Sequence, residues 1–128
     1  MKAFPVFGCG RGAYESCFTR FQTAAPMNTI DYAHNDYLQI LAELGIVAFL
    51  AGLVFAVRLM LKTIRATNGS LAIACVGSLS AMLLHSLVDF NLYIPANGAV
   101  FAWICGIAAA SPTAKDLQVV AFQPESLR

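Results

Sequence analysis

Three long apolar runs constrain what this chain can fold into more than any other feature of its sequence. They cover residues 44–61, 70–88 and 94–110, and each approaches the roughly 20 residues that a helix needs to cross a bilayer. Because lipid offers no hydrogen-bond partner to an open backbone, each run is predicted to be helical. We therefore expect an all-α membrane protein with three transmembrane helices.

The composition also favours lipid over water as the solvent for much of the chain. Hydrophobic residues make up 59% of the 128 residues and charged residues 12%, with a mean hydropathy of +0.68. Soluble domains contain about 45–50% hydrophobic residues and about 25% charged residues. A small soluble domain cannot bury as much apolar surface as this chain has. The formal net charge of +1 gives no attraction for polyanions. These values exclude a disordered chain, an ordinary soluble enzyme and a nucleic-acid binder.

The basic residues beside the apolar runs predict the orientation. Arg58, Lys62 and Arg65 cluster around the loop between the first two runs, whereas residues 89–93 contain neither Lys nor Arg. Because cytoplasmic loops are enriched in Lys and Arg, residues 62–69 are predicted to face the cytoplasm. The N-terminal segment and residues 89–93 then face outward, as in a multi-pass protein of the cell membrane.

This orientation divides the chain into four regions. Glycines and prolines interrupt any regular element near the N-terminus, and Asp31 is a suitable N-cap for a helix that runs into the first span. The predicted organisation is a glycine-rich periplasmic loop over 1–30, a periplasmic or interfacial helix over 31–43, a three-span membrane region over 44–111 and a cytoplasmic tail over 112–128.

The most polar stretch of the chain lies directly before the first run. A helix there would have two faces: Tyr32, Asp36, Gln39 and Glu43 on one, and His34, Leu38, Leu41 and Gly45 on the other. His34 could act as a general base near neutral pH, and Asp36 or Glu43 could do so if burial raised its pKa. The alternative is an interfacial helix whose tyrosines form an aromatic belt.

The end of the second run carries a second group of polar residues. Ser78, Met82, His85 and Asp89 fall on one helical face, where His85 and Asp89 can meet directly. Ionisable groups near a membrane usually face a partner or a water-filled cavity. The pattern predicts either a site that faces an outer cavity or a structural polar contact.

Small residues recur every four positions on the first and third runs. They are Ala48, Gly52 and Ala56 on the first, and Gly98, Ala102, Gly106 and Ala110 on the third. Such stripes let helix backbones approach closely in lipid, so they predict specific helix packing.

The cysteines give no sign of a metal site. Cys9, Cys17, Cys75 and Cys105 include no CxxC pair, and no Cys/His cluster has the spacing of metal ligands. We expect neither a metal nor a cofactor. Cys9 and Cys17 could form a disulfide if their segment is periplasmic.

Three short segments carry motifs that point to a known family. His34-Asn35, nine residues and then Gly45 lie within the string AHNDYLQILAELG; GCGRGAY precedes it at 8–14, and HSLVDFNL follows at 85–92, with IPAN at 94–97. Together, and in this order, these segments resemble the O-antigen ligase and O-antigen polymerase family. Its members are bacterial inner-membrane proteins of surface polysaccharide assembly.

The resemblance implies glycan transfer at the outer face of the inner membrane. In the family, a glycan on polyprenyl diphosphate is transferred to a sugar hydroxyl, on lipid A–core for ligases or on another repeat unit for polymerases. By resemblance, His34 is either a base for that hydroxyl or a hydrogen-bond donor to the diphosphate. The candidate residues are His34, Asp36 and Glu43 as catalytic groups, and Arg11, Asn35, Tyr37, His85 and Asp89 as substrate-binding groups.

The length of the chain adds a further expectation. Family members have more spans before the glycine-rich segment, so the chain resembles the C-terminal part of such a protein. It is expected to be inactive alone unless an N-terminal partner chain completes the site. The alternative is a small membrane protein without chemistry that associates through its small-residue faces. Membrane lipid is an expected partner in both cases, and nucleic acid in neither.

Overall fold

The computed structural model describes residues 4–21, 32–67 and 69–121, which form helices and one isolated antiparallel bridge between Ala66 and Thr113. The proposed N-cap Asp31 lies outside the described residues. In chain order the elements are α1 (Tyr14–Phe18), η1 (Thr19–Phe21), α2 (Asp36–Ile64), α3 (Gly69–His85), η2 (Asn91–Tyr93), α4 (Pro95–Ala110) and α5 (Ala114–Ala121).

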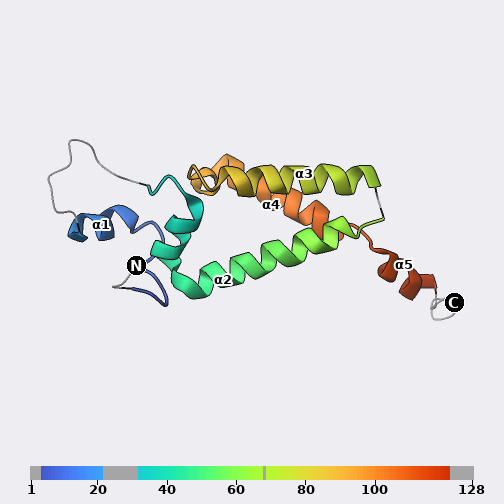
Figure 1. The fold of residues 1–128 in the computed structure, drawn as a ribbon, viewed down its shortest axis with the longest axis horizontal. Helices are drawn as coiled ribbons and strands as arrows, with labels where there is room; N and C mark the ends of the chain where they lie inside the picture. Colours follow the sequence, from blue (N-terminus) through green and yellow to red (C-terminus); the bar gives the residue numbers. More distant parts are fainter. Residues whose placement is uncertain (1–3, 22–31, 68, 122–128) are drawn as a thin grey trace.

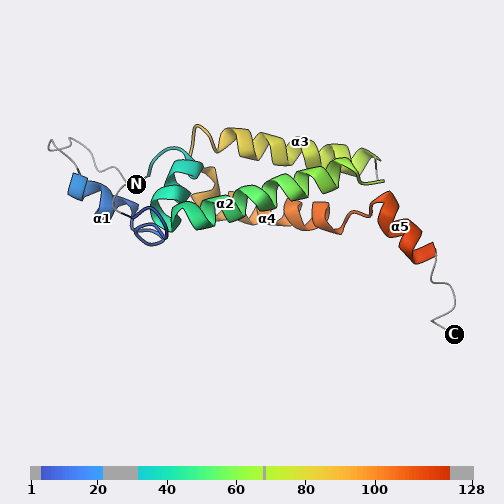
Figure 2. The same ribbon diagram turned by 60° about the horizontal axis from the view of Figure 1, so that its bottom comes forward.

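The three long helices form an elongated bundle. α3 contacts both α2 and α4, and α2 contacts α4 (Figure 1). The buried core of the bundle consists of Leu59, Cys75, Leu79, Cys105 and Ala108. α1 lies beyond one end of the bundle, and α5 leaves it at the other end (Figure 2). The predicted tail over 112–128 therefore contains a helix of eight residues.

One of the three predicted spans corresponds to a helix that is long and apolar enough to cross a membrane. α2 has 29 residues, and only 11% of its most apolar stretch is buried inside the protein. α3 and α4 are apolar but have 17 and 16 residues, which correspond to about 26 Å and 24 Å of helix against a hydrocarbon core of about 30 Å. The all-helical class is thus correct for the described residues, and the three-span arrangement stays a prediction.

The helix predicted over 31–43 begins later than expected. α2 starts at Asp36, because Asn35 is extended and its side chain accepts a hydrogen bond from the Leu38 amide at 3.0 Å. This is an N-cap of the usual kind. The preceding His34 has a left-handed backbone (φ 49°), which is incompatible with a continuing helix. Tyr32 and His34 therefore do not lie on a helical face, contrary to the prediction from residue spacing.

α2 changes direction sharply at Gly45, which has φ 76° and ψ −176° (Figure 1). Two helical hydrogen bonds are replaced there by bonds to the glycine segment, which we define as residues 5–12. The amides of Ile46 and Val47 donate to the carbonyls of Pro5 and Val6 at 3.0 and 3.4 Å.

The freed carbonyls of α2 are also satisfied by the glycine segment. The amides of Cys9 and Gly10 donate to the carbonyls of Ala42 and Glu43 at 3.0 and 2.9 Å. A Cβ atom at Gly8 would lie 2.2 Å from the Glu43 carbonyl, and one at Gly45 would lie 2.2 Å from the Val6 carbonyl oxygen. Only glycine permits this approach of two backbones, and the kink joins the N-terminal segment to the start of α2.

Candidate functional site

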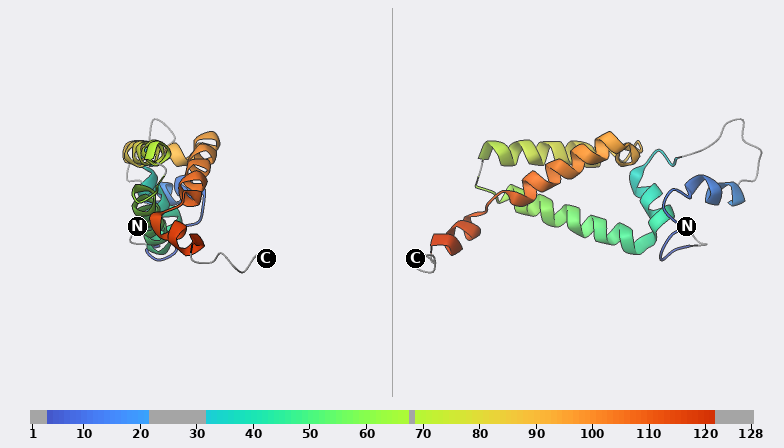
Figure 3. Two further views of the ribbon diagram at one scale, coloured as in Figure 1. Left: turned by 90° about the vertical axis from the view of Figure 1, so that its right-hand side faces the viewer. Right: turned by 180° about the vertical axis from the view of Figure 1, so that it is seen from behind.

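Most of the buried polar side chains that the structure describes lie at one end of the bundle. The start of α2, the connection between α3 and α4, and the glycine segment meet there (Figure 3). The contacts are specific: the Asp36 amide donates to the Ser86 carbonyl at 3.0 Å, and the Gly10 amide donates to the Glu43 carbonyl. Three segments that are distant in sequence thus enclose one cluster.

Glu43 lies at the centre of this cluster and is fully buried. Its Oε2 accepts from the Gly12 amide at 2.8 Å and from the Tyr93 hydroxyl at 2.9 Å. Its Oε1 accepts from the Gln39 side-chain amide at 3.3 Å. A carboxylate can be buried when both oxygens are hydrogen-bonded in this way. Glu43 therefore links the glycine segment, α2 and η2.

Asp36 performs a similar function about two helical turns earlier. Its Oδ2 accepts from the Leu92 amide at 2.9 Å, which fixes the start of η2 against α2. The other oxygen, Oδ1, and the Ser86 hydroxyl are buried without a hydrogen-bond partner. Gln39 completes the buried set, because its Oε1 accepts from the Ala33 amide at 2.9 Å and thereby holds the chain that leads to His34.

Two histidines flank one carboxylate at the accessible surface of this end. His34 Nδ1 lies 3.7 Å from Asp89 Oδ1, and His85 Nε2 lies 3.7 Å from Asp89 Oδ2. The His34 side chain is 71% exposed, and those of His85 and Asp89 are about half exposed. His85 and Asp89 do meet at the end of the second run, as the spacing predicted.

Aromatic rings support the His34 side of this group. Tyr32 stacks on Phe90 with centroids 4.5 Å apart, and His34 contacts the same ring edge-on at 5.1 Å. Tyr93 contacts Tyr32 edge-on at 6.3 Å. Such pairs are favourable beyond their burial, so the rings fix the short non-helical stretch that carries His34.

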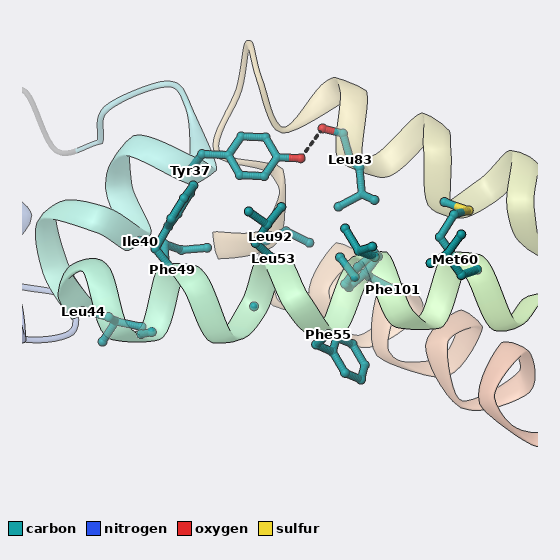
Figure 4. A pocket seen from close by; sticks show the side chains of 15 residues that line it. Tyr37, Ile40, Leu44, Phe49, Leu53, Phe55, Met60, Leu83, Leu92 and Phe101 are labelled. Carbon is teal, nitrogen blue, oxygen red and sulfur yellow. Dashed lines mark hydrogen bonds between the residues drawn. The ribbon is translucent and has the colours of Figure 1, made fainter.

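The remaining predicted residues lie around the same end. Asn35 caps α2 and also donates to the Leu87 carbonyl at 2.7 Å. The Tyr37 hydroxyl donates to the Leu83 carbonyl at 2.7 Å and borders an apolar cavity of about 520 Å³ (Figure 4). Arg11 is exposed, and it lies near enough to Tyr93 to lower the pKa of that hydroxyl slightly.

Tyr93 belongs to the site, although sequence reasoning did not select it. Burial raises the pKa of its hydroxyl well above the usual 10.0, and the hydrogen bond to Glu43 raises it further. The hydroxyl therefore stays protonated and serves as a donor to Glu43. No pattern in the sequence marks Tyr93, because its partner lies 50 residues earlier in the chain.

Cys9 and Cys17 are free thiols that line one hollow beside α1, so the disulfide that the sequence permits is not formed in this structure. Burial, together with a hydrogen bond to Cys17, raises the pKa of the Cys9 thiol to about 11. Among the described residues, no group of three His, Cys, Asp or Glu side chains is arranged to hold a metal ion.

Over the described residues, these features define a class: an all-helical protein with one helix long and apolar enough to cross a membrane, and a polar site at the start of that helix. Residues 1–53 match the family model described as O-Antigen ligase. The match contains the glycine segment, His34 and Gly45, so the resemblance to this family is confirmed over these residues. The segment 85–97, which also carried the resemblance, lies outside the match. No curated protein and no solved structure matches the chain significantly.

Proposed function

We propose that this chain forms part of the glycan-transfer site of an O-antigen ligase or polymerase in the bacterial inner membrane. The observation that carries the proposal is the group of His34, Asp89 and His85, which is accessible and lies on a buried, hydrogen-bonded support. The family match over residues 1–53 supports the same assignment.

In the proposed reaction, the His34 imidazole removes the proton from the acceptor sugar hydroxyl. The hydroxyl oxygen then bonds to the anomeric carbon of the donor, the bond from that carbon to the diphosphate oxygen breaks, and polyprenyl diphosphate leaves. Asp89 orients His34 and stabilises its protonated form, as a carboxylate does for a general base. The present distance of 3.7 Å is that of a charge pair, and such contacts often shorten when substrate binds.

The other candidates take supporting roles in this proposal. Arg11 is suited to bind the diphosphate, because a guanidinium group can donate two parallel hydrogen bonds to phosphate oxygens. His85 and Asn35 border the acceptor side, and the cavity beside Tyr37 is apolar enough to take part of the polyprenyl chain. Asp36 and Glu43, although nominated as catalytic groups, are fully buried, and we therefore assign them to positioning the three segments.

The proposal includes three membrane spans in the inner membrane, with the His34 end outside. Exposed apolar side chains on α3 and α4 support it, since Ile73 and Trp103 are each about three-quarters exposed. Lipid would cover such side chains. Reporter fusions after residues 67 and 111 test the orientation, and activity of a periplasmic reporter at either position would contradict it.

The experiment for the transfer function changes the His34 codon at the chromosomal locus and measures surface polysaccharide on gels. His34→Ala should abolish the polysaccharide. His34→Gln separates the two roles, because glutamine can donate a hydrogen bond to a diphosphate but cannot act as a base at neutral pH. Gln118→Ala, on exposed α5, is the control. Unchanged polysaccharide in His34→Ala would refute the proposal.

A second candidate function is association with a partner through the small-residue stripes. A Cβ atom at Gly52 or Gly106 would contact nothing within 4 Å, so these glycines do not serve close packing inside the described part of the chain. They are open to a helix of another protein. This candidate predicts that Gly52→Leu and Gly106→Leu abolish co-purification of a partner, whereas His34→Ala leaves the phenotype unchanged.

A further inference from the structure

We infer that the end of the bundle opposite to His34 binds the headgroup of an anionic phospholipid. Four cationic side chains line one hollow there: Arg58, Lys62 and Arg65 of the α2 end, and Lys115 of α5. Arg58, Arg65 and Lys115 are exposed. This site is separate from the proposed transfer site and does not depend on it.

One backbone hydrogen bond and one side-chain hydrogen bond hold the end of α2 against the segment that precedes α5. The Thr67 amide donates to the Pro112 carbonyl at 3.0 Å, and Lys62 donates to the Ala109 carbonyl. The carboxylate of Asp116, which lies close enough to Lys62 and Lys115 to feel their charge, accepts from the Thr113 amide at 2.8 Å and from its hydroxyl at 2.7 Å. Asp116 therefore caps α5, and the described residues that line the hollow include four cationic side chains and no carboxylate.

Helix energetics alone disfavour such a cluster, because like charges three or four residues apart destabilise a helix. Attraction to the carboxyl end of a helix accounts for Lys62 and Arg65, which lie in or next to the last turn of α2. It does not account for Arg58, which lies more than a turn earlier. The helix dipole is unfavourable for Lys115, because this residue lies in the first turn of α5, where the dipole favours anions.

The apolar surface next to the hollow indicates that the anion is a lipid. α5 leaves the bundle (Figures 1 and 3) and exposes Leu117 and Val120. A short helix with exposed apolar residues beside basic ones is typical of attachment at a bilayer surface. Basic groups at the membrane boundary select anionic headgroups. We therefore assign the hollow to the phosphate of a phospholipid, and Leu117 and Val120 to its acyl region.

The test measures phospholipid retention on the detergent-solubilised full chain by native mass spectrometry. Phosphatidylglycerol should be retained, and phosphatidylcholine should not. Arg65→Gln with Lys115→Gln should weaken phosphatidylglycerol binding about 25-fold, at about fivefold for each charge removed. Arg20→Gln removes one exposed charge at the other end and should change binding less than twofold, whereas Arg65→Gln alone should weaken it about fivefold.

Two further arms distinguish a bound lipid from a free phosphate ion and from attraction by charge alone. Leu117→Gln with Val120→Gln keeps every charge and should still weaken retention, since the apolar contact is lost. Sodium phosphate should displace the lipid no better than sodium chloride of equal ionic strength, and stronger displacement would indicate a site for free phosphate and overturn the assignment. Equal retention of both lipids, or an unaffected Arg65/Lys115 variant that keeps its helix content by circular dichroism, would also overturn it.

Discussion

Replacing Glu43 by glutamine should destabilise the His34 end of the protein, and the hydrogen bonds around Glu43 give the magnitude. The carboxylate accepts three bonds, from Gly12, Tyr93 and Gln39, whereas a glutamine side chain has only one acceptor oxygen. If that oxygen keeps the hydrogen bonds from the Gly12 amide and the Tyr93 hydroxyl, the new NH2 group faces the NH2 group of Gln39. Both groups are donors, so no hydrogen bond forms between them. The Gln39 side-chain amide cannot rotate by a half-turn to offer its oxygen instead, because that oxygen already accepts from the Ala33 amide.

The change thus removes one bond to a charged group and leaves two buried donors unpaired, which costs about 2–4 kcal/mol. Thermal unfolding of the solubilised protein should show a midpoint lower by roughly 6–15 °C. Hydrogen exchange should become faster at the amides of the glycine segment, particularly at Gly12. The matched control is Glu15→Gln, an exposed position on α1. A Glu43→Gln protein with the midpoint and exchange rates of the control would refute this reasoning.

Three other predictions follow from the same end of the molecule. Gly45→Ala should lower the free energy of unfolding by more than about 2 kcal/mol. The new Cβ would lie 2.2 Å from the Val6 carbonyl, and the backbone there is left-handed. In the control Gly52→Ala, the Cβ meets nothing within 4 Å, so the unfolding midpoint should change little. Because the pKa of Tyr93 is raised in the folded protein, its protonated hydroxyl contributes stability that is fully present below pH 10 and is lost as the pH rises further. The native protein should therefore lose stability above pH 10 more steeply than Tyr93→Phe. Parallel curves of stability against pH for the two proteins would contradict this. The Cys9 thiol, with a pKa of about 11, should react with iodoacetamide at pH 8 about 100-fold more slowly than a free thiol of pKa 9.0, because only the thiolate attacks. Peptide mass spectrometry measures the two rates, and equal rates would contradict the raised pKa.

The long helices could be predicted from the sequence because hydropathy alone determines them. The apolar runs 70–88 and 94–110 became α3 (Gly69–His85) and α4 (Pro95–Ala110) with small shifts at the ends. The four-residue spacing also predicted the pairing of His85 with Asp89, but α3 ends at His85, and Asp89 reaches it from the turn that follows, where its amide donates to the His85 carbonyl. The contact of His34 with Asp89 could not be predicted, because it depends on how the α3–α4 connection folds back onto the start of α2.

The construction of the buried cluster was beyond prediction for a similar reason. Glycines at 8, 10 and 12 signalled a loop, but nothing in their spacing indicated that the loop would replace helical hydrogen bonds at Gly45. The helix start was misplaced because Asp31 and Asn35 are both good N-caps, and the left-handed backbone of His34 selects the second. Residue type identified Glu43 as important, and only the fold shows that its carboxylate is buried and fully bonded.

The central claim is that His34 and Asp89 act together in glycan transfer, and donor consumption in isolated membranes tests it most directly. Membranes that contain the N-terminal partner chain expected to complete the site, together with the native protein, His34→Ala or Asp89→Asn, would be supplied with glycan-linked polyprenyl diphosphate. The remaining donor would be measured over time by chromatography. We predict that both substitutions stop donor consumption, and that Glu15→Gln does not. Donor consumption at the native rate in the His34→Ala membranes would contradict the claim.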